Sequence, residues 1–208
     1  MPTVTDPAWD SAHLGDPQYV WEHLAADNAR FASGQPSHPR AAAEDLQAVA
    51  PHQRPHAAVL SCSDSRVPPE IVFDGGLGDL FVVRTAGLLL DDVALGSLEY
   101  AVQVLDVPLL VLLGHTSCGA LHSAAEVAAG RLTLSGNLAR LVAGVSPGVL
   151  AADPADAPAT HVRDLVRQVT DRSPAVAARA AAGLLIVGAV YDLQTGSVTE
   201  VCRSGAVS

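Results

Sequence analysis

The stretch that decides the fold is Ala57-Ala58-Val59-Leu60-Ser61-Cys62-Ser63-Asp64-Ser65-Arg66, an apolar run that ends in a polar motif. A second stretch repeats this plan, because Leu109-Leu110-Val111-Leu112-Leu113 is soon followed by His115-Thr116-Ser117-Cys118-Gly119. A short apolar run of this kind predicts a buried strand. Two cysteines and a histidine are therefore expected at the tips of two strands.

Further apolar runs alternate with helical segments, which predicts an α/β fold whose mostly parallel sheet is covered by helices on both faces. The expected strands cover residues 57–62, 80–84, 109–114, 184–191 and 197–202. The expected helices between and after them cover residues 93–105, 119–129, 160–172 and 174–182. We expect the strand order 2-1-3-4, with the last strand added antiparallel at the edge through a turn at Thr195-Gly196.

The chain is expected to form one domain over residues 1–208, because this length suits a single core and no second boundary interrupts it. Within the domain, residues 51–208 make the α/β core and residues 1–50 make a helical arm. Apolar residues at helical spacing predict a helix over residues 16–34. A second helix at 40–50 is rich in alanine and buries little area, so we expect the arm to need a partner surface.

The composition is that of an acidic globular protein. Hydrophobic residues make up 49% of the chain and charged residues 16%, with a net charge of −10. Such a charge repels nucleic-acid phosphates and anionic lipids, so we expect neither nucleic acid nor a membrane surface as a partner. All 12 basic residues are arginines, and the lack of lysine excludes enzymes that form a Schiff base on a lysine.

Cysteine usage and the N-terminus bear on the compartment. Three cysteines cannot all pair within one chain, and residues 1–6 lack the basic and apolar regions of a secretory signal. In a reducing compartment, cysteines bind metals or react more often than they form disulfides. No stretch is long and apolar enough to span a bilayer. We therefore expect a cytoplasmic protein.

The predicted strand order brings the two polar motifs together. In a doubly wound sheet the ligand crevice lies where the strand order reverses, between the carboxyl ends of the strands at 57–62 and 109–114. Cys62 ends the first of these strands and His115 follows the second. Their side chains are therefore expected to be neighbours in space, although they are far apart in the sequence.

Cys62, His115 and Cys118 form a candidate metal site. His115 and Cys118 are three residues apart across a strand-to-helix turn, so both side chains can face one point. Two thiolates and an imidazole are a ligand set typical of Zn²⁺, with a fourth position left for water or substrate. The helix that begins near Gly119 favours thiolates at its N-terminus. An iron–sulfur cluster would need a fourth cysteine, and Cys202 lies far along the chain, where we expect a buried structural role.

Asp64 and Arg66 follow the first cysteine and form a second candidate group. Residues two apart after a strand end can point to the same side, so we expect the arginine to hold the aspartate ionised beside the metal. Two roles are then open to the carboxylate. It accepts a hydrogen bond from the metal-bound nucleophile, which serves catalysis, or it ligates the zinc itself, which blocks catalysis. The other histidines are expected on the solvated surface.

These residues together resemble the β-class carbonic anhydrases. The Cys-Ser-Asp-Ser-Arg motif at 62–66 and the His-x-x-Cys-Gly motif at 115–119 carry the resemblance, and residues 28–34, 78–87 and 99–102 resemble flanking segments of the family. The resemblance implies reversible hydration of carbon dioxide to bicarbonate and a proton, by attack of a zinc-bound hydroxide. It therefore implies a lyase whose ligands are carbon dioxide and bicarbonate.

The resemblance also implies a role for each residue of the two motifs. The implied zinc ligands are Cys62, His115 and Cys118, with one Zn²⁺ per chain. Asp64 and Arg66 are implied as the catalytic pair, with Asp64 as the fourth zinc ligand in a closed state at lower pH.

A plant-like, bacterial type of the family is implied by the residues around the motifs, including Val59 where the other type has tryptophan. The candidate substrate-binding residues are Gln53, Phe81, Ala86, Tyr100 and Gly119. Carbon dioxide is apolar, so the aromatic and alanine side chains suit its pocket, whereas the glutamine and the glycine amide are expected to hold oxygens. The resemblance further implies a homodimer or a dimer of dimers, in which the N-terminal arm crosses to the partner and pocket residues come from across the interface.

Two other functions remain open at this point. A hydrolase of carbonyl sulfide or carbon disulfide would use the same zinc site, although Gln53 and Tyr100 favour the hydration of carbon dioxide. A non-catalytic protein would use the zinc structurally or its thiols as a redox sensor. The Asp64–Arg66 pair argues against this last function, because a structural zinc site needs no such pair.

Overall fold

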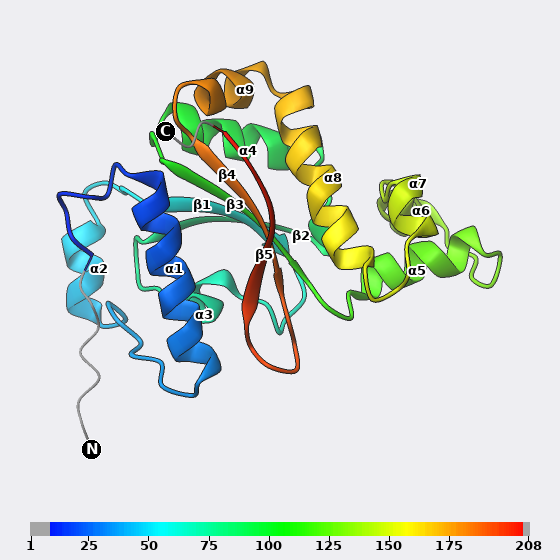
Figure 1. The fold of residues 1–208 in the computed structure, drawn as a ribbon, viewed down its shortest axis with the longest axis horizontal. Coiled ribbons are helices and arrows are strands. Elements are labelled where there is room, and N and C mark those ends of the chain that lie inside the picture. Colours follow the sequence, from blue (N-terminus) through cyan, green and yellow to red (C-terminus); the bar gives the residue numbers. More distant parts are fainter. Residues whose placement is uncertain (1–8, 206–208) are drawn as a thin grey trace.

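A computed structural model describes residues 9–205 of the chain, and its centre is a five-stranded mixed sheet (Figure 1). The strands are β1 (Ala57–Cys62), β2 (Leu80–Thr85), β3 (Leu109–His115), β4 (Leu185–Tyr191) and β5 (Val198–Ser204). Their order is β2-β1-β3-β4-β5, with the first four parallel and β5 antiparallel to β4. The predicted α/β class, strand order and antiparallel edge are confirmed.

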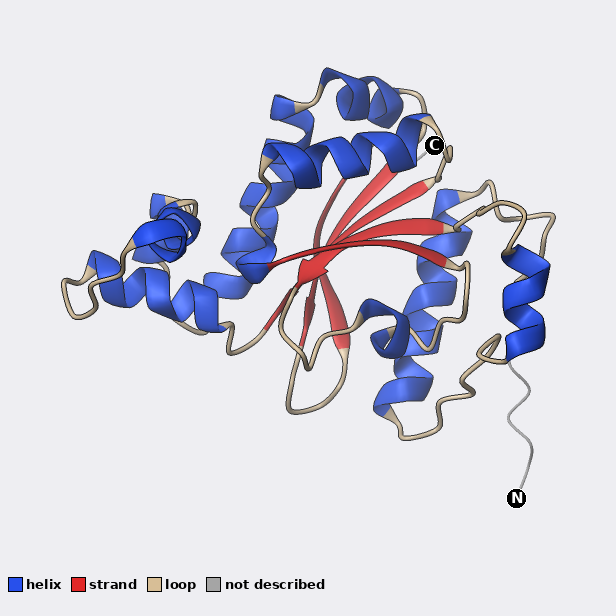
Figure 2. Ribbon diagram, turned by 180° about the vertical axis from the view of Figure 1, so that it is seen from behind, coloured by secondary structure: helices blue, strands red, loops and turns tan. Residues whose placement is uncertain are grey.

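Helices cover both faces of the sheet, as the two opposite views show (Figures 1 and 2). They are α1 (Pro17–Ala32), α2 (Ala43–Val49), α3 (Pro69–Val72), α4 (Asp92–Gln103), α5 (Gly119–Ala128), α6 (Gly136–Ala143), α7 (Pro147–Ala151), α8 (Ala157–Arg172) and α9 (Pro174–Ala181), with a 3-10 turn η1 (Ala86–Leu88) after β2. The short helices α3, α6 and α7 were not predicted. Within residues 9–205, no helix combines the length and the apolar character needed to cross a membrane.

Two hydrophobic cores follow from the alternation of side chains along the strands. In β1, Ala58 and Leu60 face the core under α4, α8 and α9, whereas Ala57 and Val59 face the core under α1. Every residue of β1 and of β3 is buried, since each face of the sheet is covered. This explains why these strands read as continuous apolar runs in the sequence.

Helix α1 belongs to the core of its own chain. The Asp16 carboxylate caps it by accepting a hydrogen bond from the Gln18 amide at 2.9 Å. Its buried side chains, which include Val20 and Leu24, pack on the sheet. The prediction that residues 16–50 as a whole reach for a partner is therefore wrong for α1. It still holds as an expectation for α2, which buries none of its side chains in this chain.

Helix α8 lies close against β3 and β4 because two glycines make room for it. A Cβ atom on Gly114 would lie 2.6 Å from Val162 Cγ2, and one on Gly188 would lie 2.6 Å from Val162 Cγ1. No side chain tolerates contacts this short, so only glycine at both positions lets Val162 sit on the sheet. This contact fixes where α8 lies relative to the carboxyl end of β3.

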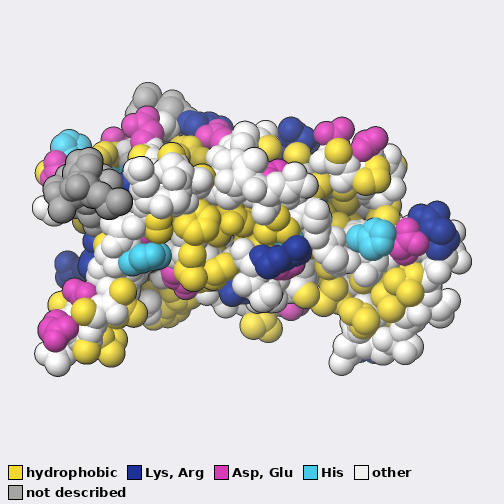
Figure 3. Space-filling model, turned by 90° about the horizontal axis from the view of Figure 1, so that it is seen from below, with side chains coloured by type: hydrophobic (Ala, Val, Ile, Leu, Met, Phe, Trp, Pro, Cys, Tyr) yellow, Lys and Arg dark blue, Asp and Glu magenta, His cyan; other side chains and the backbone are white. Residues whose placement is uncertain are grey.

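Helices α5, α6 and α7 extend to one side of the sheet (Figures 1 and 2). Their mutual contacts surround an apolar pocket of about 210 Å³. Hydrophobic side chains remain visible on the surface of this extension (Figure 3). The exposed hydrophobic residues in this part of the chain include Leu132 and Leu138. The extension therefore leaves apolar surface uncovered beside the helix that begins at the second motif.

Candidate metal centre

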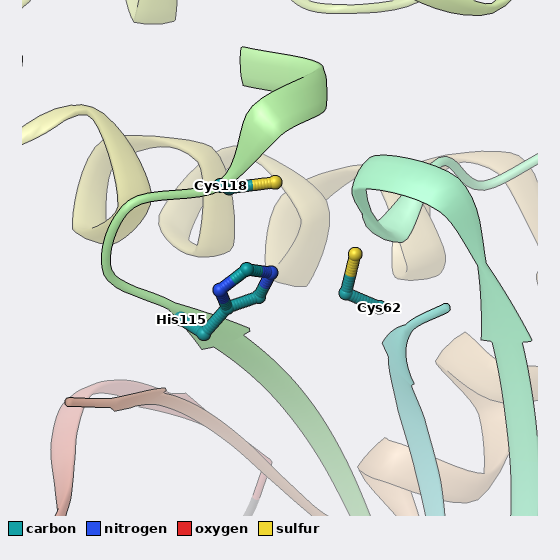
Figure 4. Close-up of side chains that lie close together, drawn as sticks. All are labelled: Cys62, His115 and Cys118. Carbon is teal, nitrogen blue, oxygen red and sulfur yellow. The ribbon is translucent and has the colours of Figure 1, made fainter. Parts of the chain in front are cut away.

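The two polar motifs meet at the carboxyl end of the sheet. Cys62 is the last residue of β1, His115 is the last residue of β3, and Cys118 immediately precedes α5. The three side chains point toward one another (Figure 4), and their sulfur and ring nitrogen atoms lie within 4.8 Å of one another. All three residues are buried. The structure thus brings together the predicted metal ligands, as expected for strands that flank a reversal of strand order.

A tight turn folds Cys118 back toward His115. Ser117 has φ of 56°, in the left-handed region that few non-glycine residues adopt. The turn is anchored to β4, because the Thr116 amide donates to the Tyr191 carbonyl at 3.0 Å and the Thr116 hydroxyl accepts from the Leu193 amide at 3.0 Å. These contacts explain how a spacing of three residues places both side chains at one point.

The His115 ring is oriented for metal binding. Its Nδ1 lies 2.9 Å from the Thr116 carbonyl oxygen, and since a carbonyl only accepts, Nδ1 carries the proton. Its Nε2 then carries the lone pair, and this buried atom has no hydrogen-bond partner among the described residues. A buried acceptor without a partner, on a ring held by its other nitrogen, fits a metal ligand.

The two thiols are suited to a divalent cation. Cys62 Sγ accepts hydrogen bonds from the Gly87 amide at 3.3 Å and the Asp64 amide at 3.4 Å. The pKa of Cys62 is lowered to about 3, first by the hydrogen bond from the Cys118 thiol and further by these two amides. The pKa of Cys118 is raised in turn, because the Cys62 thiolate and burial oppose a second negative charge. A divalent cation such as Zn²⁺ supplies the charge that both thiolates need.

Asp64 and Arg66 form a closely held pair beside these ligands. Arg66 Nε donates to Asp64 Oδ1 at 2.9 Å, Arg66 Nη2 donates to Oδ2 at 2.7 Å, and the Arg66 amide donates to Oδ1 at 3.0 Å. The Arg66 guanidinium thereby holds the pKa of Asp64 well below its usual range, so the carboxylate is ionised. Its oxygens are not among the atoms that converge within 4.8 Å. In this conformation both Asp64 oxygens accept hydrogen bonds from Arg66.

Sequence reasoning missed Arg84, which supports the first motif from β2. Arg84 Nε donates to the Cys62 carbonyl at 2.9 Å, and Nη2 donates to the Asp64 carbonyl at 2.7 Å. These bonds fix the backbone on both sides of Ser63. The available signal was an arginine within the otherwise apolar run of the second strand.

The buried histidines were also misjudged. His161 on α8 is only 3% exposed, and its Nε2 lies 2.8 Å from the Gly87 carbonyl oxygen. His23 on α1 is also buried. The prediction that the remaining histidines lie on the solvated surface is wrong for both.

The predicted substrate-binding residues fall into two groups. Ala86 and Gly119 lie near the ligands, since Ala86 precedes Gly87 in η1 and Gly119 follows Cys118, and both are exposed. An added Cβ on Gly119 would meet nothing within 4 Å, so space is open at this point.

The second group lies at the other end of the sheet. Phe81 pairs with Ala58 of β1, which precedes Cys62 by four residues, or about 13 Å along a strand. Tyr100 lies beside Phe81, with 6.0 Å between the ring centroids. Gln53 precedes the first residue of β1 and is exposed. One chain therefore does not bring these three side chains to its own metal centre, and their expected role in a pocket across an interface stays a prediction.

Comparisons with known proteins agree with this site. Residues 57–198 match the carbonic anhydrase family. The chain is 45% identical over 190 residues to a carbonic anhydrase of Mycolicibacterium smegmatis, covering 88% of this chain and 92% of the relative. It is 44% identical over 189 residues to carbonic anhydrase 2 of Mycobacterium tuberculosis, covering 87% and 91%.

Solved structures share the fold. Tetrameric β-carbonic anhydrases of Sordaria macrospora include a chain with a TM-score of 0.69 at 22% identity, covering 90% of this chain and 100% of that chain. A Coccomyxa β-carbonic anhydrase in complex with acetazolamide gives a TM-score of 0.65 at 25% identity, covering 96% and 89%. The present chain belongs to the β-class carbonic anhydrases, and Cys62, His115 and Cys118 are its zinc ligands.

Proposed function

We propose that Asp64 and Arg66 carry the reversible hydration of carbon dioxide at this zinc site. The observation that supports the proposal most strongly is the bidentate hydrogen bonding of Asp64 by Arg66, directly after the ligand Cys62. Zinc held by Cys62, His115 and Cys118 would act as a Lewis acid and would supply a hydroxide nucleophile near neutral pH. The chain itself must orient that nucleophile and receive an apolar substrate.

Asp64 is proposed to orient the nucleophile. An ionised carboxylate can only accept hydrogen bonds, so it selects one orientation of a neighbouring O–H group. Arg66 occupies one side of the carboxylate with both of its donors, which fixes the plane of the group. The Arg84 bonds to the backbone on either side hold the motif in place. The pair thus provides a fixed acceptor beside the metal ligands.

The amide of Gly119 is proposed to hold an oxygen of the product. Gly119 is the first residue of α5, and the first amides of a helix have no partner within it. The positive end of the helix dipole also favours the negative charge that develops as carbon dioxide becomes bicarbonate. The exposed Ala86 supplies apolar surface near the same ligands, which suits the uncharged substrate.

A homodimer is proposed to complete the pocket. β2 lies at the edge of the sheet and is rich in apolar residues. Val93 and Tyr100 of α4 and Val104 directly after it are exposed, the first of them by 79%. Contiguous apolar surface beside a free strand edge favours association. The tetrameric assembly named for the Sordaria enzymes is consistent with an oligomer, whether a dimer or a dimer of dimers.

The symmetry of such a dimer supports a pocket shared between chains. Two copies of β2 that meet across a two-fold axis run antiparallel. The beginning of β2 in one chain, where Phe81 lies, would then face the end of β2 in the partner, next to the partner's metal centre. Gln53 and Tyr100 would accompany Phe81. This arrangement gives a role to the three predicted residues that lie far from the metal centre of their own chain.

Complementation between two variants tests the shared pocket. Cys62→Ser removes the zinc site of a chain but keeps its Gln53, whereas Gln53→Ala keeps the zinc site. In a mixed dimer, the intact zinc site regains a glutamine from its partner. We expect subunit exchange to restore hydration to about a quarter of the wild-type rate, because about half of the dimers are mixed and each has one complete site.

A matched mixture controls this experiment. Cys62→Ser mixed with His115→Ala should restore nothing, because each variant lacks its own zinc site and neither can supply a ligand to the other. If the mixture with Gln53→Ala is no more active than the mean of the two parents, the shared pocket is wrong. The zinc site itself would be unaffected by that result.

We also propose a cytoplasmic location. The three cysteines are free in the structure, and two of them must be thiolates to bind zinc. A reducing compartment keeps thiols in the form that binds metal. Fractionation of the source cells, with detection by an antibody against the chain, tests this location.

A further inference from the structure

His161 is a buried polar residue that the proposed function does not use. Its Nε2 lies 2.8 Å from the Gly87 carbonyl oxygen, which only accepts, so Nε2 carries the proton and donates. Its Nδ1 is therefore unprotonated, and this atom has no hydrogen-bond partner among the described residues. The ring thus makes one polar contact, and that contact reaches a loop 74 residues away in the sequence.

That loop has an unusual backbone conformation. Gly87 has φ of 72°, and the next residue, Leu88, has φ of 55° although it carries a branched side chain and is buried. A non-glycine residue at positive φ is strained. Rotating the peptide group between Gly87 and Leu88 by half a turn would return Leu88 to negative φ and would swing the Gly87 carbonyl away from His161. The hydrogen bond from His161 opposes this rotation.

The same glycine also supports a zinc ligand. The Gly87 amide donates to Cys62 Sγ at 3.3 Å. A Cβ on Gly87 would lie 2.8 Å from the Ala120 Cβ, so the loop is packed against the first turn of α5 as well. The Gly87 amide belongs to the preceding peptide group, so a rotation of the Gly87–Leu88 peptide affects its hydrogen bond to the Cys62 thiolate by shifting the Cα atom of Gly87. Such hydrogen bonds set the charge on a ligating sulfur and the orientation of the ligand.

The position of His161 is itself fixed by the fold. The neighbouring Val162 fits against Gly114 and Gly188 on the sheet, which sets the height of α8 above β3 and β4. Gly114 directly precedes the ligand His115. Gly114, next to the ligand His115, thereby helps to place α8. Helix α8 in turn carries His161, which contacts the loop whose Gly87 amide donates to the ligand Cys62.

We propose that His161 is a positioning residue of the zinc site, which holds the Gly87 carbonyl so that the Gly87 amide remains directed at the Cys62 thiolate. The inference rests on the zinc ligands and is independent of the roles proposed for Asp64 and Arg66. It concerns how firmly zinc is held and the electronic state of the Cys62 sulfur.

Two polar variants test the inference. In His161→Gln the side-chain amide nitrogen lies at the distance of Nε2 and still reaches the Gly87 carbonyl, whereas in His161→Asn it reaches only as far as Nδ1. We expect His161→Asn to release zinc about 10 to 100 times faster into a chromophoric chelator, the range typical of lost partners of metal ligands. His161→Gln should release zinc at close to the wild-type rate. The thiolate-to-cobalt absorption band of the cobalt-substituted protein should shift in the asparagine variant alone.

A packing variant on the same helix provides the control. Val169 is fully buried on α8, and Val169→Ala should lower the urea midpoint without changing zinc release. Equal zinc release from His161→Asn and His161→Gln would overturn the proposal. The proposal would also be overturned if the rate of zinc release in His161→Asn and in Val169→Ala depended only on how far each variant lowers the urea midpoint. Carbon dioxide hydration is not needed for any of these readouts, so they stand even if the proposed roles of Asp64 and Arg66 fail.

Discussion

Cys62→Ser is expected to lose its zinc and with it the hydration of carbon dioxide. A serine hydroxyl does not ionise near neutral pH, so the site would keep one thiolate and one imidazole, too few for zinc. Loss of a mere partner of a ligand costs about 10 to 100-fold in metal affinity, so loss of the ligand should cost more than about 100-fold. Metal analysis and stopped-flow hydration on the same sample measure both effects.

The third cysteine offers a matched control for this variant. Cys202 lies in β5, half-buried and outside the cluster of candidate ligands. Cys202→Ser makes the same chemical change and should keep one zinc per chain and the wild-type rate. Full zinc content in Cys62→Ser, or an equal loss in both variants, would show that the ligands are wrongly assigned.

Asp64→Asn is expected to keep its zinc and to lose most of its activity. The amide has no charge and offers only one acceptor oxygen, so the pairing of both Asp64 oxygens with Arg66 is lost, and with it the fixed acceptor beside the ligands. Positioned groups of this kind contribute about 10² to 10⁴-fold, and we expect kcat/KM to fall within that range. Since Arg66 lowers the pKa of Asp64, the wild-type carboxylate stays ionised throughout pH 6.5 to 9, and its titration should not shape the profile there.

A second arginine–carboxylate pair, formed by Glu126 of α5 and Arg131 just after this helix, provides the control. Arg131 donates to Glu126 through Nε at 2.9 Å and through Nη2 at 2.7 Å, the same bidentate geometry away from the ligands. Glu126→Gln should leave hydration unchanged. Wild-type hydration by Asp64→Asn at full zinc content would refute the catalytic role. A loss of zinc from that variant would instead show that Asp64 serves metal binding.

The fold and the metal ligands were predictable because both leave local patterns in the sequence. Strands buried on both faces read as unbroken apolar runs, as in residues 57–60 and 109–113. The position of Cys62 and His115 at strand ends then follows from the rule that ligands bind where the strand order reverses. The predicted strand order and that rule together placed Cys62 and His115 side by side.

The rest of the site depends on contacts that leave no local pattern. Arg84 and His161 act on the backbone of distant residues, and a side chain that donates to a carbonyl requires no particular partner residue. The packing of the first helix of the arm was mispredicted, because α1 buries only a few large side chains but places them on its own sheet. The second group of candidate residues, such as Phe81, lies far from the metal centre of its own chain, so a role in the pocket depends on the proposed dimer.

Stopped-flow hydration of carbon dioxide during a titration of Zn²⁺ into the metal-free protein tests the central claim most directly. We expect no fast hydration without zinc, a linear rise as zinc is added, and a plateau at one zinc per chain. Complete activity without zinc would contradict the account. A protein with one zinc per chain that hydrates no carbon dioxide at any pH between 6.5 and 9 would also contradict it. Release of sulfide from carbon disulfide by that protein would then identify it as a hydrolase of carbon disulfide.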